Sequence, residues 1–387
     1  MNLALKQFIE YLVCPITKSS LREASEEEIK ELNMQIVNKK LSYYNGNVVE
    51  KQISEGLVTV DGRFFHSVDS DIVSLLSDSA IDLHQVSLES QSNEMIQDKK
   101  NVQQFYDEFG WQKEEETGLY QDTFLFTDKR PLSGEYFHKC HLRLNQYLNH
   151  GGRYLLDIAS GAIPHPEYIG YSDTYDFRIC VDFSLLALKE AKSKLGDKGI
   201  YILADITNIP ILSNVIDSVI SLHTVYHVPK DEQGKACSEI YRVLKPSGCA
   251  LIVYTWNYSL LMNLGFLPIR FIRKFKTTAK YFLNFLNLKT IGNSSSEIKL
   301  PKSEDSSSSF NLYFNPQDFQ WFESDVQSLS ENVELKVWSS VSTYFLITYI
   351  HEYFFGRQIL ALIYFLEDLF PKLLGRFGQY PIFLIKK

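Results

Sequence analysis

The chain has 387 residues, more than one compact core usually holds, so we expect two domains or one extended domain. Its 39 basic and 47 acidic side chains give a net charge of -8, which disfavours a general nucleic-acid-binding protein. The five cysteines are scattered without a CxxC pair, so they suggest neither a disulfide framework nor a zinc knuckle and favour a reducing cytoplasm. The start lacks a signal-peptide layout, and the apolar stretch 343–370 contains charges that disfavour a membrane span.

Changes in composition divide the chain. The segment from Ser77 to Lys100 has few large apolar side chains and predicts a linker. We therefore expect a small α+β domain at residues 1–76, a linker at 77–101 and the main domain at 102–387. No internal repeat is visible.

The middle of the chain alternates short apolar runs with helical patterns, which is typical of βαβ units and a mostly parallel sheet. We predict an α/β, Rossmann-like fold of seven strands with helices on both faces. The predicted strands are residues 154–158, 178–182, 200–204, 218–222, 249–254, 333–338 and 381–385. Ligands of such sheets bind beyond the carboxyl ends of the strands, so the residues directly after each strand are the candidate site.

Acidic residues end or follow three successive predicted strands. Asp157 opens a turn of small residues that includes Ser160 and Gly161, where backbone amides can approach a ligand closely. Asp182, 25 residues further on, can bind both hydroxyls of a ribose. Asp205 offers a carboxylate suited to the edge of an adenine ring. Asp157 and Asp182 could instead cap the helices that follow them.

Five stretches in this region resemble, in the right order, the motifs of the class I, type-11-like S-adenosylmethionine-dependent methyltransferases. They are LLDIASGAIPHPEY, RICVDFSLLALKEAKSKL, YILADITNIPI, DSVISLHTVYHVP and EIYRVLKPSGCALIVY. The resemblance covers about residues 154–254 and implies S-adenosyl-L-methionine as the cofactor. A nicotinamide-dependent dehydrogenase would also place an acid after its second strand, but it normally needs phosphate-binding glycines that are lost here.

The resemblance implies a role for each strand end. The implied residues are Asp157, Ser160 and Gly161 along the methionine part, Asp182 at the ribose, and Phe183, Asp205 and Ile206 at the adenine. One departure concerns the acid-x-Gly-x-Gly-x-Gly pattern, of which only Gly161 remains, since Ala159 and Ile163 replace the outer glycines. Ile163 implies a reshaped loop.

The segment after the fourth predicted strand should face the sulfonium. His227 or Tyr226 could take a proton from an oxygen or nitrogen nucleophile, because imidazole titrates near neutral pH and a phenol can relay a proton. Alternatively His227 packs at a helix start, and methyl transfer proceeds mainly by alignment of the reacting atoms. We expect His223 to contact the cofactor or to support the loop.

Two upstream segments, 102–112 and 134–148, resemble the helices that cover the cofactor in this family. The candidates for closing the pocket are Tyr106, Trp111, Tyr136 and Arg143. Arg143 could pair with the methionine carboxylate. Each of the four could equally be a core aromatic residue or a surface cation.

The first domain, through EYLVCPITKSSL and LVTVDGRFFHSVDSDIVSLL, resembles the small zinc-ribbon-like domain that accompanies some tRNA, rRNA and protein methyltransferases. Only Cys14 stands where a metal ligand would be, so we expect no metal and instead a scaffold or partner surface. This resemblance raises RNA as an alternative substrate, but residues 1–76 lack a patch rich in Arg and Lys.

The region at about 257–330 is expected to be a lid or substrate insertion. Within it, residues 268–289 predict a basic amphipathic helix, which could lie on an anionic membrane, receive a phosphorylated or lipid-linked substrate, or simply cover the core. The Ser-rich run 292–310 predicts a loop. We expect a cytoplasmic protein with peripheral contact to the inner membrane face through 268–289, and a homodimer.

These observations lead to one hypothesis and two alternatives. The hypothesis is methyl transfer to an oxygen, or less readily to a nitrogen or carbon, of a small metabolite, glycan or lipid-linked intermediate. The alternatives are methylation of rRNA or tRNA, and a non-catalytic adaptor that binds the cofactor.

Overall fold

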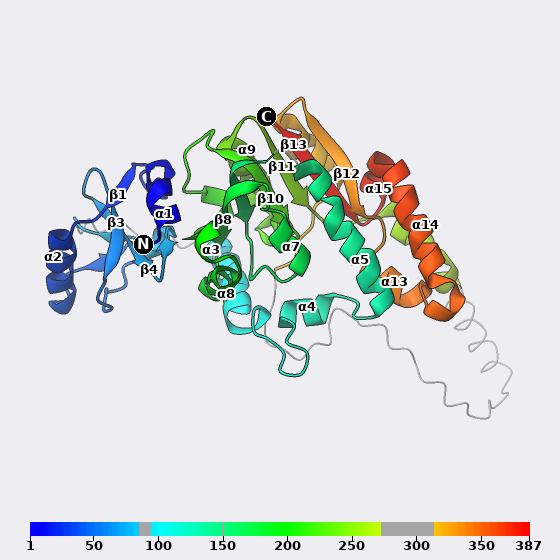
Figure 1. The fold of residues 1–387 in the computed structure, drawn as a ribbon, viewed down its shortest axis with the longest axis horizontal. Helices are drawn as coiled ribbons and strands as arrows, with labels where there is room; N and C mark the ends of the chain where they lie inside the picture. Colours follow the sequence, from blue (N-terminus) through cyan, green and yellow to red (C-terminus); the bar gives the residue numbers. More distant parts are fainter. Residues whose placement is uncertain (85–93, 149–150, 272–312) are drawn as a thin grey trace.

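The computed structural model describes residues 1–84, 94–148, 151–271 and 313–387. The small first domain lies at one end of the molecule and helix α14 (Gly356–Leu369) at the other, with the main sheet between them (Figure 1). Within these residues, no helix is long and apolar enough to cross a bilayer. Most of the predicted helix 268–289, and all of the Ser-rich run 292–310, lie outside the described residues.

All seven predicted strands are present, and the Rossmann-like fold is confirmed. They are β7 (Gly152–Ile158), β8 (Tyr175–Asp182), β9 (Gly199–Leu203), β10 (Ile216–Leu222), β11 (Leu244–Val253), β12 (Val333–Ser339) and β13 (Tyr380–Lys386). Their order is β9-β8-β7-β10-β11-β13-β12, with β7 to β11 parallel and β13 antiparallel to both neighbours. The parallel strands are buried along nearly their whole length, as expected of a sheet covered on both faces.

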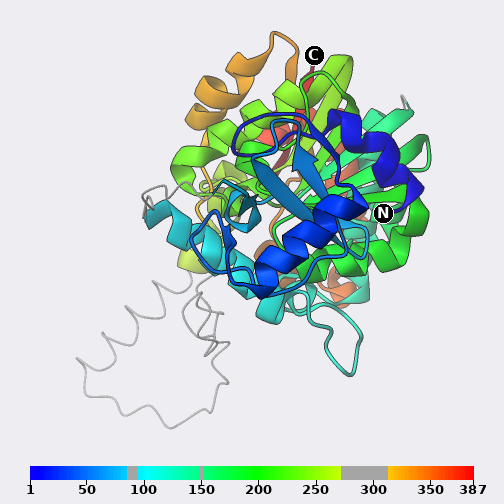
Figure 2. The same cartoon turned by 90° about the vertical axis from the view of Figure 1, so that its left-hand side faces the viewer.

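The sheet is larger than the seven strands that we predicted. A strand of the first domain, β5 (Ile72–Ser74), pairs in parallel with β9, so the two domains share one sheet of 13 strands. The other strands of the first domain are β1 (Leu21–Glu23), β2 (Ser42–Tyr43), β3 (Glu55–Thr59), β4 (Phe64–Asp69) and β6 (Ile81–Asp82). Figure 2 views the molecule from the end that carries them.

The boundary of the first domain also differs from the prediction. Strand β6 pairs with β2 and β4, so the domain extends beyond residue 76 to at least Asp82. Helix α3 (Glu94–Phe105) begins inside the stretch that we expected to be linker, 77–101. The polar composition of this stretch concealed both elements, because β6 is two residues long and α3 has a weakly apolar face.

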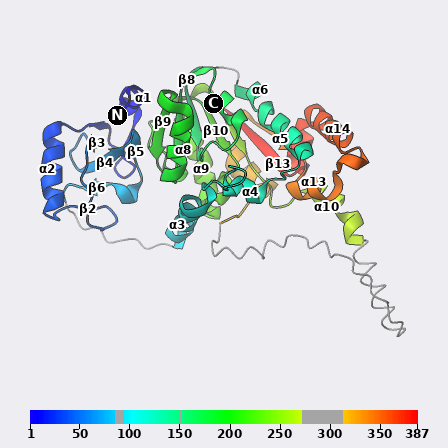
Figure 3. The ribbon, with the colours of Figure 1, turned by 60° about the horizontal axis from the view of Figure 1, so that its bottom comes forward.

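The remaining helices flank the sheet. They are α1 (Leu3–Phe8), α2 (Glu26–Val37), α4 (Gln121–Phe126), α5 (Pro131–Arg143), α6 (Asn145–Leu148), α7 (Pro166–Gly170), α8 (Leu185–Leu195), α9 (Gln233–Val243), α10 (Leu260–Gly265), α12 (Phe319–Trp321), α13 (Thr343–Tyr349) and α15 (Pro371–Phe377). Helix α3, the π-helical turn Tyr106–Gly110 and α4 lie on the side that comes forward in Figure 3. These three elements contribute the side chains that cover the strand ends.

Candidate cofactor and acceptor site

The loop after β7 retains the backbone shape that glycines would favour. Ala159, Gly161 and Ile163 all have left-handed backbone conformations, with φ of 52°, 56° and 51°. These are the three glycine positions of the family pattern, and all three have a backbone conformation that favours glycine. A β-branched residue in this conformation is strained, and such strain persists only where the surrounding structure enforces it.

Asp182, at the end of β8, connects the loop after β7 to the start of α8 through hydrogen bonds. Its Oδ2 accepts a hydrogen bond of 2.8 Å from the Gly161 amide, and its Oδ1 accepts one of 2.8 Å from the Ser184 amide. Burial raises the pKa of Asp182 to about 6, and the two amides only partly oppose this shift. Two carboxylate oxygens offer about four acceptor positions, so Asp182 can still accept the hydroxyls of a ribose.

Two aromatic side chains from the cover lie over this loop. A Cβ placed on Gly161 would stand 2.5 Å from the ring of Trp111, so only glycine fits beneath that ring. Tyr106 stacks on Trp111 with ring centroids 5.2 Å apart. The Nε1–H of Trp111 is buried and has no hydrogen-bond partner among the described residues. A buried donor without an acceptor is costly, and the carboxylate of a methionine group beside Gly161 would satisfy it.

The third acid, Asp205, has other partners. Its Oδ2 accepts from Lys99 Nζ at 2.9 Å, and its Oδ1 accepts from the Thr207 amide at 2.8 Å. Lys99 also pairs with Glu232. The ion pair of Lys99 with Asp205 holds α3 over the end of β9. Ile206, the residue after Asp205, is buried. Each Asp205 oxygen retains a further acceptor position, as in Asp182.

Phe183 and Ser160 lie at the same edge of the sheet. The Phe183 carbonyl accepts from Gln103 Nε2 of α3 at 2.9 Å, which fixes the cover against the end of β8. Ser160 is buried, and its amide donates to the Val181 carbonyl. Both residues therefore join the loop formed around Gly161.

Asp157 lies beneath the loop and is paired within the protein. Its Oδ2 accepts from Nε of Arg178 at 3.1 Å and also from Nη2 of the same guanidinium, which has no exposed surface. Arg178 also donates to the Tyr168 carbonyl. This buried pair joins β7 to β8 and α7, so Asp157 supports the loop where we had expected a residue along the methionine part.

The structure contradicts the cofactor roles of Arg143 and the pocket-closing role of Tyr136. Arg143 donates to the Trp338 carbonyl and pairs with Glu367 and Asp368. The Tyr136 hydroxyl donates to the same Glu367 at 2.6 Å. The two residues are seven positions apart and therefore share the face of α5 that packs on α14, which directs them away from the loop.

The residues after β10 occupy a second part of the site. His227 Nδ1 lies 2.8 Å from the Tyr313 carbonyl, which can only accept, so Nδ1 carries the proton. Burial lowers the pKa of His227 to about 4, so its Nε2 is an unprotonated, weak base at neutral pH. Burial raises the pKa of the neighbouring Tyr226 well above its usual value, so its hydroxyl can donate but does not readily give up its proton.

His223 has a different environment from that of His227. It adopts a left-handed conformation with φ of 60°, and its ring contacts Trp338 and Tyr380 with centroids 4.5 and 5.6 Å away. Burial, and then the nearby His165 and His227, lower its pKa to about 3. A neutral His223 that packs on aromatic rings supports the loop.

Asp122 of α4 is a candidate that the sequence did not reveal. Its helix α4 packs on the π-helical turn that contains Tyr106, and the Tyr106 ring centroid lies 6.3 Å from the His227 ring centroid. The side chain is partly accessible and has no hydrogen bond or ion pair with any described residue. Enclosure by protein raises its pKa to about 7. It lies in a short helix without a motif, so only the tertiary structure reveals it.

The first domain contains a separate buried pair of side chains. Cys14 Sγ lies 3.4 Å from His66 Nε2, and neither residue is exposed. Within the described part of the chain, no group of three or more His, Cys, Asp or Glu side chains could hold a metal ion.

Comparisons with known proteins agree with this geometry. Residues 156–252 match the profile of a family described as "Methyltransferase domain". No curated protein matches the chain. This segment begins in β7 and ends in β11, so it contains the loop at Gly161, Asp182 and the residues after β10.

Solved structures show only distant likeness. A complex of the Haloferax volcanii Trm112 methyltransferase activator with a methyltransferase aligns at 18% identity, over 32% of this chain and 58% of that one, with a TM-score of 0.26. An Archaeoglobus fulgidus SAM-dependent methyltransferase aligns at 15% identity, over 65% and 94%, with a TM-score of 0.36. Haemonchus contortus phosphoethanolamine N-methyltransferase 2 aligns at 14% identity, over 65% and 52%, with a TM-score of 0.37.

The strand order and the loop after β7 define a Rossmann-like domain that binds a nucleoside cofactor at its strand ends. The family match covers residues 156–252, so this part of the chain is a methyltransferase domain, with S-adenosylmethionine as its cofactor.

Proposed function

We propose that the protein methylates a hydroxyl oxygen of a small acceptor without a phosphate at the reacting end, and that Asp122 takes the hydroxyl proton. The observation that carries this proposal is the position of Asp122: a partly accessible carboxyl without a partner among the described residues, on the helix that packs on the turn of Tyr106, whose ring contacts His227. A general base works best when its pKa lies near the working pH, and about 7 meets that requirement.

The residues of the loop after β7 would hold the cofactor. When bound, S-adenosylmethionine supplies an electrophilic methyl carbon on a sulfonium. Asp182 would accept from the ribose hydroxyls, and Trp111 Nε1–H would donate to the methionine carboxylate. Phe183 and Ile206 would flank the adenine.

The proton has a defined destination in this scheme. As the acceptor oxygen is methylated by the bound cofactor, which would leave as S-adenosylhomocysteine, Asp122 would accept the hydroxyl proton and release it to solvent. His227 Nε2 would accept a hydrogen bond from the acceptor but is too weak a base, with a pKa of about 4, to hold the proton. Tyr226 would donate a hydrogen bond to an acceptor oxygen, and neither residue requires a charged acceptor.

The cations near these residues favour an acceptor that is not a phosphate. Lys194 already donates to the Ala162 and Ile163 carbonyls and to the Tyr120 hydroxyl. Lys99 is held by Asp205 and Glu232. A phosphate would require a cation that is free to pair with it, whereas a neutral hydroxyl of a metabolite, glycan or lipid-linked acceptor needs none.

The first domain would act as a scaffold. Its strand β5 completes the sheet edge beside β9, and β9 precedes Asp205. Removing this domain would expose the edge of the strand that supports the adenine side of the site.

The test uses cofactor labelled in its methyl group and a metabolite extract, followed by a purified acceptor. We expect Asp122→Asn to lower kcat by about 100-fold or more, with unchanged affinity for S-adenosylhomocysteine in calorimetry. Glu116→Gln, an exposed change in the same segment, is the matched control. In the wild type, kcat/KM should rise with pH through about 7.

Each other outcome has a clear meaning. If Asp122→Asn turned over as fast as the wild type, Asp122 would not be the general base. Label found mainly in RNA would favour the alternative substrate, and no label in any fraction, despite cofactor binding, would favour an adaptor.

A further inference from the structure

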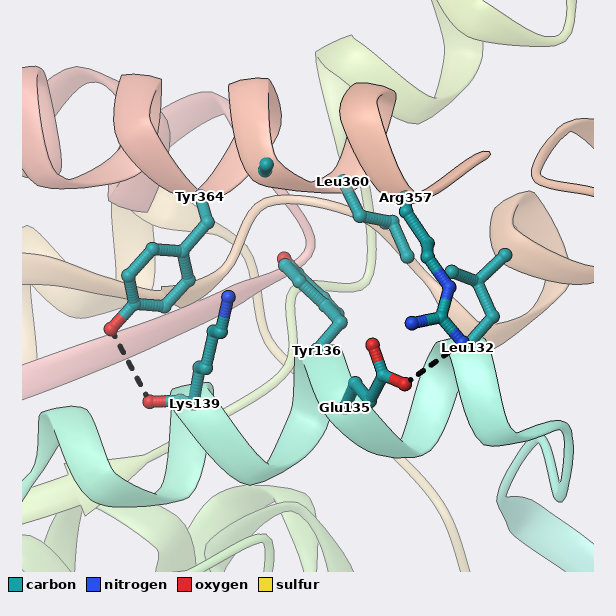
Figure 4. Close-up of a pocket in the computed structure, with 8 residues that line it drawn as sticks. Leu132, Glu135, Tyr136, Lys139, Arg357, Leu360 and Tyr364 are labelled. Carbon is teal, nitrogen blue, oxygen red and sulfur yellow. Dashed lines mark hydrogen bonds and ion pairs between the residues drawn. The ribbon is translucent and has the colours of Figure 1, made fainter. Parts of the chain in front are cut away.

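Helix α14 is attached to the protein by one face only. Leu360 and Tyr364 point toward α5, and the Tyr364 hydroxyl approaches the Lys139 carbonyl (Figure 4). Arg357 pairs with Glu135 of α5 at 3.1 Å. The two helices leave a pocket of about 40 Å³ beside Arg357 and a larger one of about 530 Å³ beside Asp368.

The outer face of α14 is apolar and uncovered by the described residues. Leu362, Phe365 and Leu369 are 56%, 60% and 55% exposed. The same surface includes Ile359, Leu366, Phe370 and Leu373. A helix that is apolar on both faces is normally buried on both, and contiguous apolar patches of this kind mark interaction sites.

An aromatic turn precedes α14 and extends the patch. Tyr353, Phe354 and Phe355 are 96%, 71% and 73% exposed. They follow α13, which packs on the end of α10: the Tyr349 hydroxyl donates to the Gly265 carbonyl at 2.7 Å. The residues after α10 include Phe271, which is 77% exposed. The helices α10, α13 and α14 lie at the same end of the molecule (Figures 1 and 3).

The exposed charges around this surface are of both signs. Asp368 is paired with Arg143, and Glu352 with Arg357. Lys372 and Arg270 are exposed and have no ion pair with a described residue. The surface therefore combines apolar side chains with two cations that have no ion-pair partner among the described residues, beside carboxylates that share one cation in pairs.

We propose that the outer face of α14 and the aromatic turn bind the surface of a bilayer that contains anionic lipids. Exposed aromatic and aliphatic side chains would enter the headgroup boundary, while Lys372 and Arg270 would meet lipid phosphates. A second copy of the chain is the less favoured occupant, because a twofold contact would bring these cations of both copies together. This proposal does not depend on the identity of the methyl acceptor.

The test is co-sedimentation of the full-length protein with vesicles of phosphatidylcholine alone or with phosphatidylglycerol added. We expect binding to the anionic vesicles, weakened at least about tenfold by Phe365→Glu/Leu369→Glu. Met34→Glu/Val37→Glu, on exposed apolar positions of α2 in the first domain, is the matched control and should bind like the wild type. Calorimetry with S-adenosylhomocysteine verifies that each variant is folded.

Two results would overturn the proposal. One is a wild type that binds neither kind of vesicle, and the other is equal vesicle binding by the α14 variant. If light scattering shows a dimer that the α14 variant alone converts to monomers, and vesicles are not bound, the face joins two copies of the chain instead.

Discussion

Replacing Asp122 with Asn should make the protein more stable at alkaline pH even as it removes activity. In the unfolded chain, this carboxyl ionises near pH 3.8, whereas in the folded protein its pKa is about 7. The folded state therefore resists ionisation of Asp122, and the wild type loses stability as pH rises from about 4 through about 7. Asn carries no charge at any of these pH values, so the variant is spared that loss.

The size of the effect follows from the difference in pKa. Each unit corresponds to about 1.4 kcal/mol, so a difference of about 3 units gives an upper bound of about 4 kcal/mol above pH 8. At pH 5 the pH exceeds the pKa of the unfolded state by only about one unit, so only about a third of this free-energy cost applies. The stability gap between Asp122→Asn and the wild type should thus widen by up to about 3 kcal/mol between pH 5 and pH 8.

Urea unfolding of both proteins at pH 5 and pH 8, followed by tryptophan fluorescence, measures this gap. Glu116→Gln, which changes an exposed carboxyl, should show no such widening. A constant gap across the pH range would mean that Asp122 is solvated or paired in solution, and the argument for its role as a base would fail with it.

Three further changes test the cofactor loop. Asp182→Ala should lower the affinity for S-adenosylhomocysteine by about tenfold or more, measured by calorimetry, because a charge-assisted hydrogen bond is worth about 1.5–3 kcal/mol; equal affinity would remove the ribose assignment. Arg178→Met leaves Asp157 buried without a partner, so we expect a loss of about 3–5 kcal/mol in unfolding free energy, partly recovered in Arg178→Met/Asp157→Asn. Gly161→Ala should destabilise the protein by at least about 1–2 kcal/mol through its left-handed backbone, and adding Trp111→Ala should relieve only the further cost of the steric clash.

The strands were predictable because each is a short apolar run between turn residues, a pattern set by burial on both faces of the sheet. The extent of the sheet was not, because β5 is three residues long and its pairing with β9 joins segments more than 100 residues apart. Local pattern contains no information about such a partner.

The candidate site was predictable where a strand end fixes the position of a residue. Asp182 and Gly161 meet because β7 and β8 are parallel neighbours, which the order of motifs implies. The partner of each carboxylate depends on residues from other parts of the chain. Arg178 pairs with Asp157, and Lys99 pairs with Asp205. Arg143 was assigned wrongly for the same reason, since Glu367 lies more than 200 residues further along the chain.

The loop after β7 keeps a left-handed backbone at two positions where the family pattern has glycine, Ala159 and Ile163. Its backbone is fixed from outside, by the hydrogen bond from the Gly161 amide to Asp182 and by three interactions of Lys194 that include the Ile163 carbonyl. These contacts compensate for the left-handed strain at Ile163, which is about 1–2 kcal/mol for a residue with a side chain. At Gly161 no such compensation is available, because the Trp111 ring occupies the place of a Cβ. Glycine is therefore kept at position 161, where the Trp111 ring leaves no room for a Cβ. At Ala159 and Ile163 the side chain adds only the cost of the left-handed backbone conformation.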